Sequence, residues 1–144
     1  MSQRECLEFL ARSRLARLAC DRDGQPYIVP MYVAYDDGWI YGFATVGRKI
    51  DWLRHNPRVC IEVDEIVALQ QWKSVVVLGR FEELRDTPEL RDARGRAYDL
   101  LKQHASWWVE AYLRVAIERE PRALEPIYFR ISVDEISGRR AETP

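Results

Sequence analysis

The sequence feature that most constrains the fold is residues 27–35, a strand-like segment that is apolar on both of its faces. In an extended chain successive side chains point to opposite sides, and here both sets, represented by Val29 and Ile28, are apolar. Such a strand must be covered on both sides, by a barrel interior and by a ligand, a helix or a second subunit. Pro30 cannot donate to a ladder, so it marks an edge, a bulge or a place where the sheet opens.

Turn signals divide the chain into further strands and helices. Asp36-Asp37-Gly38 predicts a type I′ hairpin turn, after which residues 39–44 return as the next strand. Helical spacing at residues 3–12 and a helix start at residues 86–89 add flanking helices, and residues 65–71 are expected to be irregular. Four other segments have strand patterns: residues 15–20, 59–64, 72–84 and 127–133. The expected class is mainly β with flanking helices (α+β), built on a six-stranded antiparallel barrel.

A candidate anion site lies where one of these strands leads into a short helix that Asn56-Pro57 stops. Thr45 offers a hydroxyl, and Arg48 and Lys49 offer adjacent cations at the helix start. The first N–H groups of a helix lack intrahelical partners and the helix dipole is positive there, so these residue types suit a phosphate group. An ordinary helix start with solvated cations is the alternative that these residues alone leave open.

Residues 42–49 also resemble the phosphate loop of nucleotide hydrolases. That loop needs Lys directly after its second Gly, followed by Ser or Thr for magnesium. Arg48 occupies the lysine position and no hydroxyl residue follows it, so we exclude a nucleotide hydrolase.

The composition predicts one domain spanning residues 1–144. A chain of 144 residues, with 47% hydrophobic and 31% charged residues, is long enough to bury roughly 70% of its unfolded surface. The net charge of −1 excludes an electrostatic nucleic-acid site. Three widely spaced cysteines and two histidines form no zinc pattern, so we expect no metal site and free thiols in a reducing cytoplasm. Without a signal-peptide core or an apolar run near ~18 residues, a cytoplasmic protein without a membrane partner is expected.

Five segments, in this order and spacing, resemble the pyridoxamine 5′-phosphate oxidase-like, flavin-binding split barrels. They are Val29-Pro30-Met31-Tyr32, residues 40–45, Gly47-Arg48-Lys49 with Leu53, Asn56-Pro57-Arg58-Val59, and residues 72–79. The resemblance covers roughly residues 14–138. It implies a six-stranded antiparallel split β-barrel that forms a homodimer, with two FMN sites at the subunit interface.

The resemblance also implies which residues bind the cofactor. Arg48 and Lys49 resemble the phosphate cations, with Thr45 beside the ribityl-phosphate. The backbone of residues 29–31 resembles the edge that meets the isoalloxazine ring. Ser74 lies at the position where the oxidases place a polar side chain against the flavin. The full expected set is Val29, Pro30, Met31, Phe43, Ala44, Thr45, Arg48, Lys49, Trp72 and Ser74. No catalytic side chain is assigned.

Departures from the family narrow the expected activity. The segment 45–49 looks shorter than in the true oxidases, and Val76 stands where their arginine-rich substrate contacts would be, which argues against pyridoxamine phosphate oxidation. Nitroimidazole-resistance reductases tend to carry a His before the turn, where this chain has Gly42 and Phe43. We therefore expect an FMN-dependent oxidoreductase acting on an unidentified small molecule.

Two alternatives share the expected barrel. One is a reductase that uses a deazaflavin cofactor, and the other is a flavin- or haem-binding protein without turnover. His55 and His104 are the only imidazoles, and their positions suit haem poorly. Trp107-Trp108 could belong to the core or close over a ligand.

Overall fold

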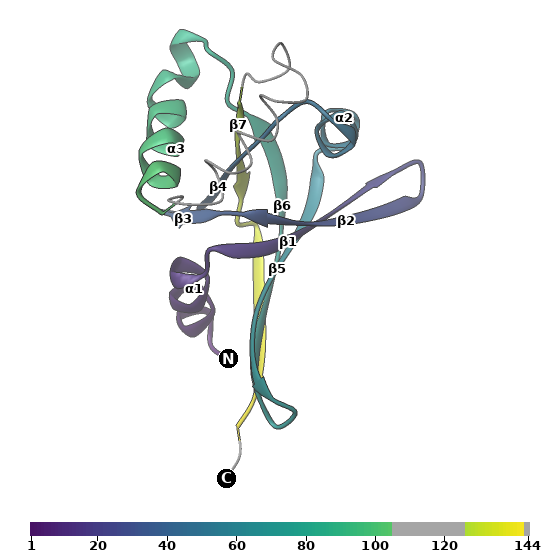
Figure 1. Cartoon of the computed structure of the whole chain (residues 1–144), viewed down its shortest axis with the longest axis vertical. Helices are drawn as coiled ribbons and strands as arrows, with labels where there is room; N and C mark the ends of the chain where they lie inside the picture. Colours follow the sequence, from purple (N-terminus) through teal and green to yellow (C-terminus); the bar gives the residue numbers. More distant parts are fainter. Residues whose placement is uncertain (105–125, 143–144) are drawn as a thin grey trace, which may run out of the picture.

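The computed structural model describes residues 1–104 and 126–142, which form an antiparallel sheet with three α-helices around it (Figure 1). The helices and strands of this part are α1 (Gln3–Arg12), β1 (Leu15–Arg22), β2 (Gln25–Tyr32), β3 (Ala34–Asp36), β4 (Trp39–Ala44), α2 (Arg48–His55), β5 (Arg58–Ala68), β6 (Gln71–Glu83), a 3₁₀ turn η1 (Pro88–Leu90), α3 (Arg91–His104), β7 (Ile127–Ser132) and β8 (Glu135–Ala141).

The sheet is an open barrel. Its strand order is β2-β1-β5-β6-β7-β4-β3, with β8 paired to β6, and every pairing is antiparallel. The two end strands, β2 and β3, follow one another in the chain and are separated only by Val33, whose N–H donates to the carbonyl of Arg14 (2.8 Å). The sheet therefore does not close on itself by hydrogen bonds. The expected class, a split barrel with flanking helices, is confirmed.

Two Asp-Gly turns form the hairpins at the ends of β1 and β3. Asp37 and Gly38 have φ values of 43° and 83°, and Asp23 and Gly24 have φ values of 52° and 81°. A type I′ turn requires positive φ at both central positions, which Asp tolerates and Gly adopts freely. The hairpin predicted at Asp36-Asp37-Gly38 is confirmed, since Asp36 pairs with Trp39.

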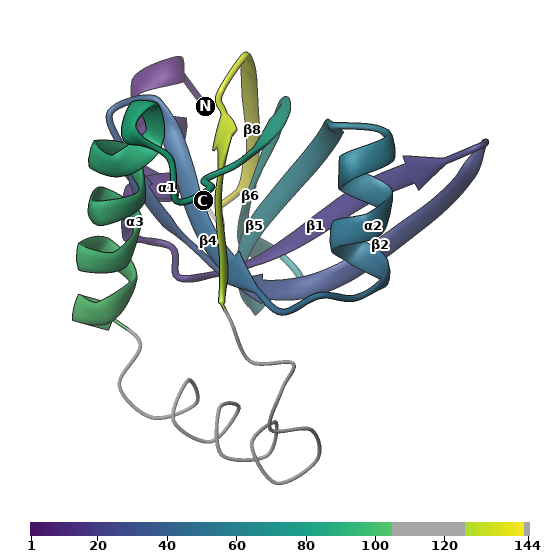
Figure 2. The ribbon, with the colours of Figure 1, turned by 90° about the horizontal axis from the view of Figure 1, so that it is seen from above.

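Apolar side chains form two clusters, one on each side of β4. Ile40 is buried in the main cluster inside the barrel, whereas Tyr41 is buried in a second cluster beneath α3. α3 and α2 lie on opposite flanks of the barrel (Figure 2). The predicted two-sided cover is thus present at β4, but Ile28 on the outer face of β2 is 62% exposed.

Three details differ from the sequence expectations. The predicted strand 27–35 is divided at Val33, because the side chains of residues 31–34 are all buried and the alternation breaks there. β5 continues to Ala68, so residues 65–68 are strand instead of irregular chain. β8 was not expected at all, and together with the division at Val33 it makes eight strands in the described part instead of six. Trp107-Trp108 lie outside the described residues.

No helix in the described part of the chain is long and apolar enough to cross a membrane.

Candidate functional site

The start of α2 has the features of an anion site. The N-cap residue is Gly47, which supplies no capping side chain, so the first N–H groups of the helix receive no side-chain acceptor from that position. The exposed guanidinium of Arg48 lies over the ring of Tyr27, 5.5 Å from its centroid, and Tyr27 in turn contacts Trp52 at 5.4 Å between ring centroids. This aromatic packing fixes the guanidinium close to the helix start.

Lys49 is the most unusual charge of the site. Its side chain is half-buried, and it forms no ion pair or hydrogen bond with any other described residue. Burial lowers the pKa of its ammonium, an effect that the nearby Cys20 thiol opposes. A partly desolvated cation without a counter-charge is costly, so this position favours binding of an anion.

The expected ring-binding edge lies close to the helix start in the fold. Met31 and Ala44 are buried with their side chains in the main cluster, Val29 is half-buried and Pro30 is exposed on the edge strand β2. Only the backbone of the two buried positions can therefore face a ligand. The position of Pro30 also settles its alternatives, because β2 ends the sheet and Pro is tolerated in such an edge strand.

Gly42 and Phe43 serve packing in this structure. A Cβ at Gly42 would lie 2.6 Å from Cζ of Phe129 and 2.9 Å from Cε of Met31, so the ring that approaches this glycine belongs to the chain itself. The Phe43 ring is 6.4 Å from that of Tyr128, on the α3 side of the sheet. Thr45 follows directly after β4 and is half-buried.

Trp72 and Ser74 lie elsewhere. Both are on the β5–β6 hairpin, whose tip extends toward the opposite end of the long axis from α2 (Figure 1). The Ser74 hydroxyl donates to Oε1 of Glu62 (2.9 Å), and Trp72 lines a pocket of about 350 Å³ near the hairpin tip. Within one chain, the expected residues other than Phe43, which faces α3, therefore form two separate groups, one around α2 and one on the hairpin.

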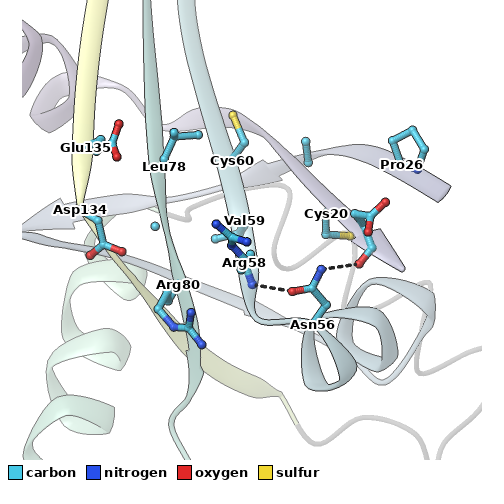
Figure 3. A pocket seen from close by; sticks show the side chains of 13 residues that line it. Cys20, Pro26, Asn56, Arg58, Val59, Cys60, Leu78, Arg80, Asp134 and Glu135 are labelled. Carbon is cyan, nitrogen blue, oxygen red and sulfur yellow. Dashed lines mark hydrogen bonds between the residues drawn. The ribbon is translucent and has the colours of Figure 1, made fainter. Parts of the chain in front are cut away.

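A larger pocket, about 590 Å³, opens on the outer face of β1, β5 and β6 (Figure 3). Its polar residues include Arg58 and Arg80 on β5 and β6, Asn56 at the end of α2, and Asp134 beside β8. None of these four residues was expected at a site from the sequence. No signal in the sequence alone could have joined them, because they meet only through the register of β5 with β6.

No group of three or more potential metal ligands occurs among the described residues. His55 lies at the exposed end of α2, with Nε2 3.6 Å from Oδ1 of Asp23.

An open antiparallel barrel with a helix start suited to an anion defines a class of protein, and comparison with known proteins names it. The model of the family described as pyridoxamine 5′-phosphate oxidase matches residues 2–140. The chain belongs to this pyridoxamine 5′-phosphate oxidase-like family.

Individual relatives agree with this membership. An uncharacterized protein of Rhizobium meliloti (strain 1021) is 42% identical over 141 residues, which cover 98% of this chain and 93% of that protein. The crystal structure of a FAD-binding protein from Mesorhizobium loti is 44% identical, with a TM-score of 0.80, over 99% of this chain and 96% of that one. A FAD-binding protein from Mycobacterium smegmatis shares the fold at 22% identity, with a TM-score of 0.65, over 99% and 98% of the two chains.

Proposed function

We propose that the protein is a homodimeric flavoprotein, an oxidoreductase that acts on a small molecule. The observation that carries the proposal is the half-buried Lys49 beside Arg48, at a helix start without a capping side chain. A cofactor phosphate would supply the counter-charge that Lys49 does not receive from the described part of the chain. The flavin named for the Mesorhizobium loti relative is FAD, and FMN carries a phosphate at the equivalent place.

The chain's own residues would bind and orient the cofactor. Arg48, Lys49 and Thr45 would hold the phosphate, and the backbone of residues 29–31 would support the ring. A bound flavin supplies the capacity to accept and donate electrons, while the protein positions it and controls its surroundings. The three free thiols fit a reducing compartment, so we place the protein in the cytoplasm.

The outer face of the sheet supports a site shared between two copies. One row of neighbouring side chains crosses four strands of this face, and it consists of Ile28 on β2, Ala19 on β1, Cys60 on β5 and Leu78 on β6. Ile28 is 62% exposed and Leu78 is 46% exposed, so this row leaves apolar surface uncovered. A second copy on this face would cover that surface and could bring its β5–β6 hairpin toward α2, which would unite the two groups of expected residues.

Titration with FMN and, separately, with FAD tests cofactor binding. We expect quenching of flavin fluorescence and a thermal shift with at least one flavin, and loss of both signals in the Arg48→Ala/Lys49→Ala protein with an unchanged circular dichroism spectrum. No response to either flavin would contradict the proposal. The ratio of the two dissociation constants decides between FMN and FAD, and competition by a deazaflavin tests the third cofactor.

Electron transfer needs a separate experiment. We expect the flavin-loaded protein to oxidise NADH or NADPH, followed by bleaching of the flavin absorption in the absence of oxygen. Flavin binding without any reduction by either donor would indicate a binding protein without this activity. Hemin should give no Soret shift, because His55 lies at the end of α2 opposite to the proposed phosphate site.

A further inference from the structure

The pocket on the outer face of β1, β5 and β6 contains two arginines that face each other. Arg58 and Arg80 are direct register partners on β5 and β6, so their side chains lie on the same face of the sheet. Like charges directly opposite one another destabilise a strand pair. Figure 3 shows both side chains at the wall of the pocket.

Neither guanidinium is neutralised by another described residue. The guanidinium groups of Arg58 and Arg80 form no ion pair and no hydrogen bond within this part of the chain. Only the backbone N–H groups of the two residues donate, to Oδ1 of Asn56 and to Oγ of Ser132. Arg17 on the same face shows the contrast, because its Nη1 lies 3.1 Å from Glu62 and 2.6 Å from Asp64. The sheet therefore supplies carboxylates to one arginine of this face and leaves the other two without them.

The other residues that line the pocket indicate which kind of anionic ligand could bind to these two arginines. Leu78 and Pro26 provide apolar wall, while Asp134 and Glu135 lie on the β8 side of the pocket (Figure 3). Arginine guanidiniums match the geometry of phosphate oxygens, and carboxylates accept hydrogen bonds from hydroxyl groups. The lining thus suits a molecule with an anionic end and a hydroxyl-bearing end.

We propose that Arg58 and Arg80 form a second anion site, which binds a phosphate group of a hydroxylated phosphate ester such as a nucleotide. This site is separate from the start of α2, since Asn56 at the other end of that helix lines the pocket, about 12 Å along the helix axis. The pocket lies on the face that we propose a second copy covers. Such cover would remove water from two like charges and increase the need for a bound anion.

Calorimetric titration with ADP tests the site, first on the protein without added flavin and then on FMN-loaded and FAD-loaded protein. We expect saturable binding to the protein without flavin, weakened about tenfold or more by Arg58→Gln and by Arg80→Gln, since each removes a charge-assisted contact. Arg91→Gln is the matched control, because it removes an exposed arginine on α3, and it should leave ADP affinity unchanged.

The flavin-loaded samples identify the source of the phosphate. If FAD binds with its pyrophosphate in this pocket instead of at the α2 start, both substitutions weaken FAD binding but not FMN binding, and ADP no longer binds the FAD-loaded protein. If the phosphate belongs to a separate molecule, ADP binds both loaded forms and FAD affinity is unchanged in the variants. The proposal is overturned if ADP does not bind saturably, or if the variants bind it as well as the unchanged protein. The proposal is also overturned if the two substitutions dissociate a dimer and leave the affinity for ADP unchanged, since the arginines would then pair with the second copy.

Because the first titration contains no flavin, failure of the flavin proposal and failure of this one are distinguishable.

Discussion

At the scale of single residues, the charge of Lys49 opposes stability but would favour the proposed binding of a ligand. Its ammonium is half-buried on α2, and burial lowers its pKa because the charged form loses hydration. A residue that served only the fold would gain from an apolar side chain at this position. The retention of a lysine there is explained if the charge is neutralised by a ligand and not by the chain.

Replacing Lys49 with Met should therefore separate the two effects. We expect the thermal midpoint of the flavin-free protein to rise by roughly 2–4 °C, the shift that about 1 kcal/mol gives in a chain of this size, while flavin affinity falls by tenfold or more. Arg48→Met is the matched control, because Arg48 is exposed. This substitution should lower the flavin affinity of the protein without raising its stability. A less stable Lys49→Met protein that still binds flavin would contradict the assignment.

The pH dependence of flavin binding follows from the same residue. The lowered pKa of Lys49 lies below the ordinary 10.5, so the ammonium of the flavin-free protein loses its proton earlier than an exposed lysine as pH rises. Flavin affinity should then fall with rising pH before 10.5 is reached. Lys49→Arg keeps its charge throughout this range and should remove the dependence, as fluorescence titrations between pH 7 and 10 would show.

At the scale of secondary-structure elements, β6 changes partners at Gly79. Residues up to Leu78 pair with β8, and residues from Phe81 pair with β7. A Cβ at Gly79 would overlap the backbone carbonyl of Ser132, which cannot move without disturbing β7. This glycine thus lies where β7 passes close to β6.

Gly79→Ala should consequently destabilise the protein by about 3 kcal/mol or more in urea denaturation, since the overlapping group is backbone. Gly95→Ala is the control within α3, where a Cβ meets nothing within 4 Å, and it should stabilise by about 0.5–1 kcal/mol through helix propensity. Equal effects of the two substitutions would show that the close approach at Gly79 does not limit the fold.

The docking of α1 should depend on acidic pH. Glu5 accepts from the backbone N–H of Ser2 (2.6 Å) and from Nη1 of Arg140 (2.6 Å), and these contacts, that with Ser2 first, lower its pKa from 4.5 to about 2. A lowered carboxyl pKa contributes stability above pH 4.5 that is lost as pH falls from 4.5 toward 2.

Glu5→Gln keeps the capping box but removes the charge. The unfolding free energy of the variant should fall less between pH 6 and pH 3 than that of the unchanged protein. Glu89→Gln is the control, because Glu89 is an exposed carboxyl on η1 without an ion pair in the described part. The unfolding free energy of this variant should fall in parallel with that of the unchanged protein. If the unfolding free energies of both variants followed that of the unchanged protein across this pH range, Glu5 would be excluded as the source of the pH dependence.

The same elements show what could be predicted from the sequence. The Asp-Gly turns and the helix from Arg48 to His55 are local signals, so both were predictable. The anion-binding role of Lys49 stays a prediction. β8 carries almost no apolar residues and is mostly exposed, so only its pairing with β6 makes it a strand. The Arg58–Arg80 pair likewise depends on register, which period and composition do not specify.

At the scale of the whole molecule, the expected cofactor residues are divided between α2 and the β5–β6 hairpin. If the site is shared, each dimer has two sites, and each site takes α2 from one copy and the hairpin from the other. Damage to α2 in one copy and to the hairpin in its partner would then concentrate in a single site. The second site would be intact.

This geometry predicts complementation between two inactive variants. Lys49→Met and Trp72→Ala should each bind flavin poorly as homodimers. Heterodimers isolated through two different affinity tags should regain about one flavin per dimer, measured by absorbance after gel filtration. If each site lay within one chain, every heterodimer would carry one defect per site and regain nothing. Tyr98→Ser, at an exposed position on α3 away from the proposed interface, is the control partner. Its heterodimer with Lys49→Met should also hold about one flavin, which confirms that the tagged dimers assemble.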